Sequence, residues 1–150
     1  MTPPMSLLRG LPVETAAKFG MPCWQARYTG RGARRYRLDD GARCLACGRP
    51  ASNCHHEPHL GMGGRNASFE LHGVELRPAL IALCGSGTTG CHGAVHSGRM
   101  SLSWRWADEA SAEAWWRGDL LGMAGSRELY RLGGWEVSRG RVRAVRAARR

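Results

Sequence analysis

The pattern of apolar and polar positions is more regular in the last third of the chain than in its beginning. Residues 101–106 (SLSWRW) alternate, which predicts a short strand because successive side chains of a strand point to opposite faces. Residues 107–117 (ADEASAEAWWR) predict a helix that ends at Gly118, with Asp108 and Glu109 suiting its positive N-terminus. Residues 119–137 predict a further helical turn or two, and residues 135–138 a strand.

The same pattern organises the chain as a core with extensions. Residues 1–39 predict a basic N-terminal arm with one short helix at 13–19, and residues 40–100 contain nearly all the residues suited to chemistry. Residues 101–138 predict a strand and helix extension. It holds five of the six tryptophans, which suggests an apolar cluster packed on the core or on another subunit. Residues 139–150 hold six arginines and no acid, and predict a frayed basic tail or a helix.

The net charge of the chain indicates which class of partner it binds. The 150 residues carry a formal net charge of +10, and 21 of the 22 basic residues are arginine, Lys18 being the exception. A bias toward arginine codons explains the choice of arginine over lysine, but it does not explain the excess of positive charge. Guanidinium groups pair with phosphate oxygens and stack on bases, so we expect a nucleic-acid partner.

One segment concentrates this charge. Residues 27–37 (RYTGRGARRYR) hold five arginines, two tyrosines and no acid. The segment is either a solvated linker or a strand or arm that follows phosphates, with Tyr28 and Tyr36 stacking on bases or sugars. We predict that DNA affinity comes mainly from the C-terminal arginines and from Arg31, Arg34, Arg35 and Arg65.

The chain has no apolar run near the roughly 18 residues that a membrane span requires, so we expect no membrane partner. Segment 1–20 has no continuous apolar stretch of the secretory type, which favours a cytoplasmic location. In that compartment, the six cysteines suit metal binding better than disulfides.

Four cysteines have spacings that suit a structural zinc site. Cys44 and Cys47 form a Cys-x-x-Cys knuckle followed by Gly48, while Cys84 and Cys91 flank GSGTTG, whose glycines allow a tight excursion. The alternative is that some of them are small buried hydrophobes. If Cys84 or Cys91 is not a ligand, Cys54 is the next candidate. Cys23 is remote in the sequence, and we assign it to packing.

The histidines predict a second metal site. His92 and His96 are four residues apart, so on a helix both rings project from one face. With one member of the pair His55-His56 they offer three imidazoles and leave positions open for water and phosphate. His59 and His72 lack this spacing and are expected in loops or at the surface.

The strings CLACGRPASNCHHEPHLGMGGR and LIALCGSGTTGCHGAVHSGR together resemble the HNH nuclease family, in the small zinc-stabilised form common in phage and bacterial genomes. The resemblance implies an α+β fold with a ββα-metal (His-Me finger) core, the arginine-rich arms and the C-terminal helical extension lying outside it. It makes His55, His92 and His96 ligands of a catalytic divalent metal and His56 the general base. Gly61, Gly63 and Gly64 would form a flexible loop.

The resemblance also implies an activity. It is hydrolysis of phosphodiester bonds in double-stranded DNA to 5′-phosphate and 3′-hydroxyl ends, with Mg²⁺, Mn²⁺, Ni²⁺ or Zn²⁺ at the histidines. Arg99, three residues after His96, would clamp a phosphate or simply add surface charge.

One departure from the family pattern keeps rival functions open. Ala79 stands where the family's central asparagine braces the base, and Asn66 is out of register. The rivals are an inactive zinc-stabilised DNA-binding module and a nuclease subunit switched on by phage packaging or recombination partner proteins. The oligomeric state stays open.

Overall fold

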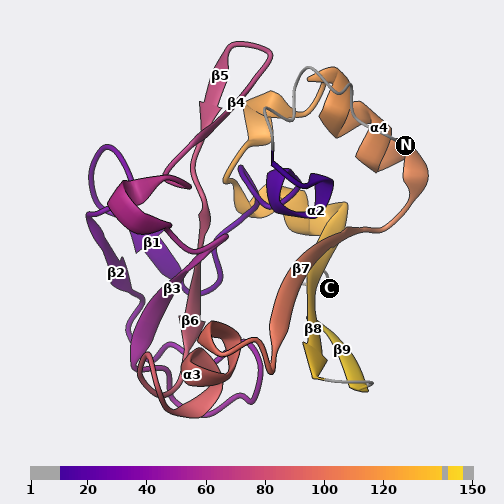
Figure 1. Cartoon of the computed structure of the whole chain (residues 1–150). Coiled ribbons are helices and arrows are strands. Elements are labelled where there is room, and N and C mark those ends of the chain that lie inside the picture. Colours follow the sequence, from indigo (N-terminus) through magenta and orange to yellow (C-terminus); the bar gives the residue numbers. More distant parts are fainter. Residues whose placement is uncertain (1–10, 140–141, 147–150) are drawn as a thin grey trace.

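The structure is a computed structural model that describes residues 11–139 and 142–146, and it mixes short helices with antiparallel strands (Figure 1). The α+β class is therefore confirmed. The elements in chain order are α2 Val13–Ala16, β1 Ala26–Tyr28, β2 Tyr36–Leu38, β3 Asn53–Glu57, η1 Met62–Gly64, β4 Phe69–Leu71, β5 Val74–Leu76, β6 Ala79–Leu83, α3 Gly90–His96, β7 Ser101–Trp106, α4 Glu109–Arg117, η2 Leu121–Met123, η3 Arg127–Arg131, β8 Gly133–Arg139 and β9 Val142–Arg146.

The residues suited to chemistry lie around one strand pair and the helix after it. β3 and β6 pair antiparallel, with His55 opposite Ile81, and α3 follows at the end of β6 (Figure 1). Every residue of β6 is buried. Trp24 bridges to Ile81 from the other side, so β6 is flanked on both edges. Its side chains are buried on both faces, which explains why its sequence is a continuous apolar run rather than an alternation.

The connection between β3 and β6 contains a second hairpin, β4–β5, which projects from the molecule (Figure 1). The predictions did not include this hairpin. Its inward residues Phe69, Leu71 and Leu76 join the core. The hairpin β1–β2 packs beside β3 and β6, and it carries the arginine-rich segment in its loop.

The C-terminal region confirms the predicted strand at 101–106 and, within two residues, the predicted helix. Asp108 caps α4 by accepting a hydrogen bond from the Ser111 amide at 2.8 Å, and Gly118 ends the helix at φ 95°. Strand β8 is longer than the predicted 135–138 and lies between β7 and β9. Residues 142–146 form β9, so the expected frayed tail or helix is wrong there; residues 140–141 and 147–150 lie outside the described residues.

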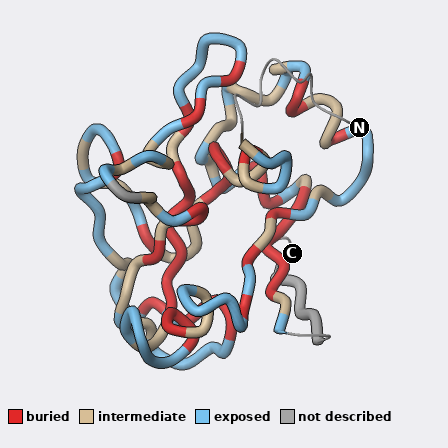
Figure 2. The backbone as a smooth tube through the Cα atoms, in the orientation of Figure 1, coloured by how far each residue is buried: buried red, intermediate tan, exposed pale blue. Residues whose placement is uncertain are grey.

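Figure 2 shows buried stretches along β6 and β8. Residues of both strands belong to one core cluster, which also contains buried Trp104, Trp115 and Trp116. Trp135 contacts Trp104 with 5.5 Å between ring centroids, and both belong to the same core cluster as Leu45 and Leu83. The tryptophan cluster therefore packs on the core, which is the first of the two arrangements that the sequence predicted. Gly20 lies at φ 79°, and a Cβ there would meet the Trp115 ring at 2.9 Å, so this position requires glycine.

The segment predicted as an arm also contributes to this core. Phe19 and Met21 are fully buried, and the Trp135 indole donates to the Pro22 carbonyl at 3.0 Å. The predicted helix at 13–19 spans only Val13–Ala16, and residues 1–10 lie outside the described residues. Among the described residues, no helix combines the length and the apolar character that crossing a membrane requires.

Candidate metal centres

Four cysteines converge below the end of the β3–β6 pair. The sulfur atoms of Cys44, Cys47, Cys84 and Cys91 all lie within 4.8 Å of one another. The first two come from the turn before β3, Cys84 directly follows β6, and Cys91 lies in the first turn of α3. Four thiols at this separation match a closed tetrahedral site, so the cluster can bind a metal ion such as zinc. We call these four residues the cysteine cluster.

Glycines shape both loops of the cysteine cluster. Gly48, which follows Cys47, lies at φ 79°. A Cβ on Gly85 would lie 2.1 Å from the Thr89 carbonyl oxygen, and one on Gly90 would lie 2.7 Å from the Gly85 Cα. The two ends of this loop therefore pack backbone against backbone, and the contact brings Cys91 close to Cys84. Gly87, the third glycine of the excursion, meets nothing within 4 Å and is not required for this closure.

One hydrogen bond favours the thiolate form of Cys84. The amide of Cys91 donates to the Cys84 sulfur at 3.4 Å, and this bond is the main reason that the pKa of Cys84 falls to about 7. A thiol with such a pKa releases its proton to a metal more readily. Arg139 of β8 donates to the Cys91 sulfur at 3.6 Å.

The two remaining cysteines lie outside the cluster. Cys23 accepts a hydrogen bond from the Leu80 amide at 3.1 Å, in keeping with a packing role. Cys54 points away from the cluster, and burial raises its pKa to about 11. All six cysteines are free thiols, so the structure contains no disulfide among them.

Three histidines form a second group. Single ring nitrogens of His55, His92 and His96 lie within 4.8 Å of one another. His55 comes from β3, while the other two lie one turn apart on α3, with 2.9 Å between their Nε2 atoms. The His55 ring lies 5.4 Å from that of His92 and 5.5 Å from that of His96. The predicted grouping is therefore present, and His55 is the member of the pair that joins it. We call these residues the histidine cluster.

The chemistry of this cluster fits a cation. Burial lowers the pKa of His92 to about 4, so its ring is neutral near pH 7 and keeps a lone pair. The His92 Nδ1 atom is buried without a hydrogen-bond partner among the described residues. Three clustered imidazoles, with exposed His96 at the rim, form a donor set that can hold a divalent metal such as zinc.

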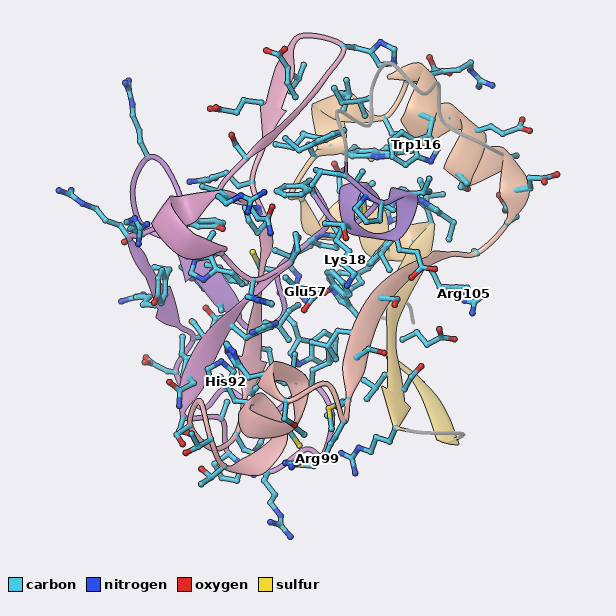
Figure 3. The ribbon with its side chains drawn as sticks, in the orientation of Figure 1. Lys18, Glu57, His92, Arg99, Arg105 and Trp116 are labelled. Carbon is cyan, nitrogen blue, oxygen red and sulfur yellow. The ribbon has the colours of Figure 1, made fainter. Side chains whose placement is uncertain are left out.

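Two charged residues beside the cluster were not predicted. The His55 Nε2 atom lies 2.7 Å from Glu57 Oε1, and Lys18 Nζ lies 2.5 Å from Glu57 Oε2 (Figure 3). Burial alone would raise the pKa of Glu57, but the hydrogen bond from His55 and the charge of Lys18 outweigh it and lower the pKa. The alternation of β3, which places residues 55 and 57 on one face, was a signal for Glu57. Lys18 comes from a distant segment, and no local pattern pointed to it.

His56 lies on the opposite face of β3. Its Nε2 atom donates to the Ala33 carbonyl at 2.6 Å, and its ring meets the Tyr36 ring at 5.0 Å. Burial lowers its pKa, which keeps the ring neutral near pH 7. The predicted general base is therefore held by the β1–β2 loop and lies outside the histidine cluster.

His59 lies next to the histidine cluster. Its ring centroid lies 5.5 Å from that of His96 and 6.3 Å from that of His55, and the residue is exposed. The prediction placed it at the surface without a role, and its contact with the cluster was missed because residues 57–59 leave the strand. His72 hydrogen bonds through Nε2 to the Trp116 carbonyl at 2.7 Å, far along the chain from the cluster.

The residues predicted to contact DNA are all exposed: Arg31, Arg34, Arg35, Arg65 and Arg99. The first three lie in the β1–β2 loop, on the side of β3 that His56 faces. Helix α3 ends at His96, and Gly98 takes φ 84°, so helical spacing does not place Arg99 on the ligand face. Ala79 is buried and pairs with Glu57 across β3 and β6, and the hydrogen bond to the His56 ring comes from the Ala33 carbonyl instead.

Comparison of the chain with protein-family models, with curated proteins and with solved structures gives no match. The function therefore has to be argued from the arrangement of these residues.

Proposed function

We propose that the protein is a metal-dependent endonuclease of the HNH type that hydrolyses phosphodiester bonds in double-stranded DNA. The observation that carries the proposal is the histidine cluster, in which one strand and the following helix present three imidazoles beside four clustered cysteines. The order strand, strand, helix and the two separate ligand sets match what the resemblance implies. The cysteines would hold structural zinc, and the imidazoles a catalytic divalent ion.

The histidine cluster leaves room for the reaction because it supplies only three ligands. A divalent cation held there would act as a Lewis acid toward a phosphodiester oxygen. The chain's own contribution is to hold His55 and His92 in buried positions while His96 faces solvent. The exposed arginines of the β1–β2 loop would hold the DNA backbone, and contacts of this kind carry little sequence information.

Two histidines can accept the proton of the attacking water, and they differ in position. His56 has the better-defined acceptor, because Nε2 donates to the Ala33 carbonyl and the lone pair is left on Nδ1. His59 is nearer the cluster and open to solvent. The resemblance favours His56, and we retain it as the base.

Incubation of the purified protein with supercoiled plasmid and Mg²⁺, Mn²⁺, Ni²⁺ or Zn²⁺ tests the proposal. We expect nicking by the wild type, and a loss of about 10²- to 10⁴-fold in rate for His56→Ala with DNA affinity retained. His59→Ala is the matched control, and a larger loss there would transfer the role to His59. Activity that requires an added partner would favour the regulated subunit.

A DNA-binding module without cleavage is the second candidate. The buried Ala79 is the observation in its favour, because its methyl group cannot form a hydrogen bond that would brace the base. Wild-type protein that binds plasmid but stays inert with every metal would establish this candidate instead.

A further inference from the structure

We infer that Glu57 and Lys18 are positioning residues that select which nitrogen of His55 binds the cation. This inference rests on the proposed metal site. Glu57 is 5% exposed and lies on the cluster face of β3, two residues after His55. Its two carboxylate oxygens are divided between two partners, Oε1 facing His55 Nε2 at 2.7 Å and Oε2 facing Lys18 Nζ at 2.5 Å.

The carboxylate determines the tautomer of His55. A carboxylate can only accept in this bond, so the His55 proton resides on Nε2 and the lone pair on Nδ1. Nδ1 is then the nitrogen available to a cation shared with His92 and His96. A carboxylate bonded to the second nitrogen of a ligating imidazole fixes the orientation of the ring and raises its basicity.

Lys18 makes this arrangement stable in the core. The Lys18 side chain is 17% exposed, and its amine contacts the second carboxylate oxygen directly, so the buried carboxylate has a partner on each oxygen. The single lysine of the sequence thus lies at Glu57, the buried carboxylate that contacts the histidine cluster.

The test measures cation affinity directly, without DNA. Protein whose cysteine cluster is filled with zinc is titrated with Co²⁺ or Ni²⁺, and binding is followed by calorimetry and by metal absorption lacking a thiolate band. For Glu57→Gln we expect affinity to fall by about 10- to 100-fold while the zinc content and the melting temperature stay near those of the wild type. Glu75→Gln, the same change at an exposed position on β5, should leave the affinity unchanged.

A second variant guards against misfolding. The double change Lys18→Met/Glu57→Leu replaces the buried ion pair by apolar side chains and leaves neither charge without a partner, an exchange that proteins tolerate well. It should fold, keep its zinc and show the same loss of cation affinity. Wild-type affinity in both variants would overturn the inference.

The outcomes separate this inference from the proposed function. Weakened cation binding in the variants, together with a wild type that binds the cation but does not cut DNA, would support the positioning role and refute the nuclease. A wild type whose cation affinity equals that of His92→Ala would refute both, since no cation would then bind at the histidine cluster.

Discussion

Two regions of the molecule, one around β3, β6 and α3 and the other around β7, β8 and α4, are stabilised by different kinds of interaction. Around β3, β6 and α3, the side chains that converge are cysteines and histidines, and the connecting loops are rich in glycine. Around β7, β8 and α4, the side chains that converge are tryptophans in edge-to-face contact. The ring centroid of Trp104 lies 5.5 Å from that of Trp106 and 5.5 Å from that of Trp135. A metal ion can replace a large apolar core where loops must stay short, and apolar burial suffices where regular elements can pack.

The largest effect should come from the cysteine cluster. Cys44→Ser removes one buried thiolate ligand, and a structural zinc ion contributes on the order of 10 kcal/mol to the folding of small metal-stabilised domains. We expect loss of zinc and loss of cooperative unfolding of the β3–β6–α3 region, measured by metal analysis and thermal denaturation. Cys54→Ser, a change outside the cluster, should keep about one zinc per chain. An unchanged melting curve after complete zinc removal would refute the role of the cluster.

A smaller but still large effect is expected in the tryptophan region. Trp135 is fully buried, and replacing such a residue with alanine costs about 3–5 kcal/mol through lost burial and the cavity left behind. Denaturant unfolding of Trp135→Ala should show this loss, while zinc content stays at the wild-type level. Loss of zinc in parallel would mean that the two regions do not differ in the way described.

A smaller loss of stability is expected at the N-terminal cap of α4. Asp108→Ala removes the hydrogen bond to the Ser111 amide and should lower the denaturant midpoint, by less than Trp135→Ala does. Asp108→Asn keeps an acceptor at the same place and should retain most of the stability in the same unfolding experiment. Equal losses in both variants would assign the effect to charge instead of to the cap.

The smallest effect on stability is expected at the histidine cluster. His92→Ala removes a ring whose Nδ1 atom is buried without a partner among the described residues, so lost packing is partly offset. We expect a change below about 1 kcal/mol in protein that keeps its zinc but has no cation at the histidine cluster, with cation binding and plasmid nicking both abolished. His72→Ala should keep both. A variant that still binds the cation would exclude His92 as a ligand.

The sequence predicted best what is encoded locally. The pairs Cys44 with Cys47 and His92 with His96 lie within one turn of chain each, so their spacing alone indicates that they share a site. The strand at 101–106 and the capped helix after it follow from periodicity in the same way.

What the sequence did not predict depends on contacts between distant segments. The β4–β5 hairpin, the pairing of β9 with β8 and the contact of Lys18 with Glu57 join residues whose patterns carry no mark of one another. The two faces of β3 were predictable in principle, because alternation separates His55 from His56. Spacing could not reveal that Ala33 holds the second ring.

The adjacency of His55 and His56 has a consequence for folding as well. A slip of β3 by one residue against β6 would exchange the two faces of the strand, directing His56 and Cys54 toward α3 and His55 toward the arginine loop. In the slipped alignment His56 would still supply an imidazole to α3 in place of His55, but Pro58 would replace Glu57 on that face. The carboxylate that contacts both the first ring and Lys18 would then be missing, so the pair of contacts made by Glu57 distinguishes the correct alignment from the slipped one.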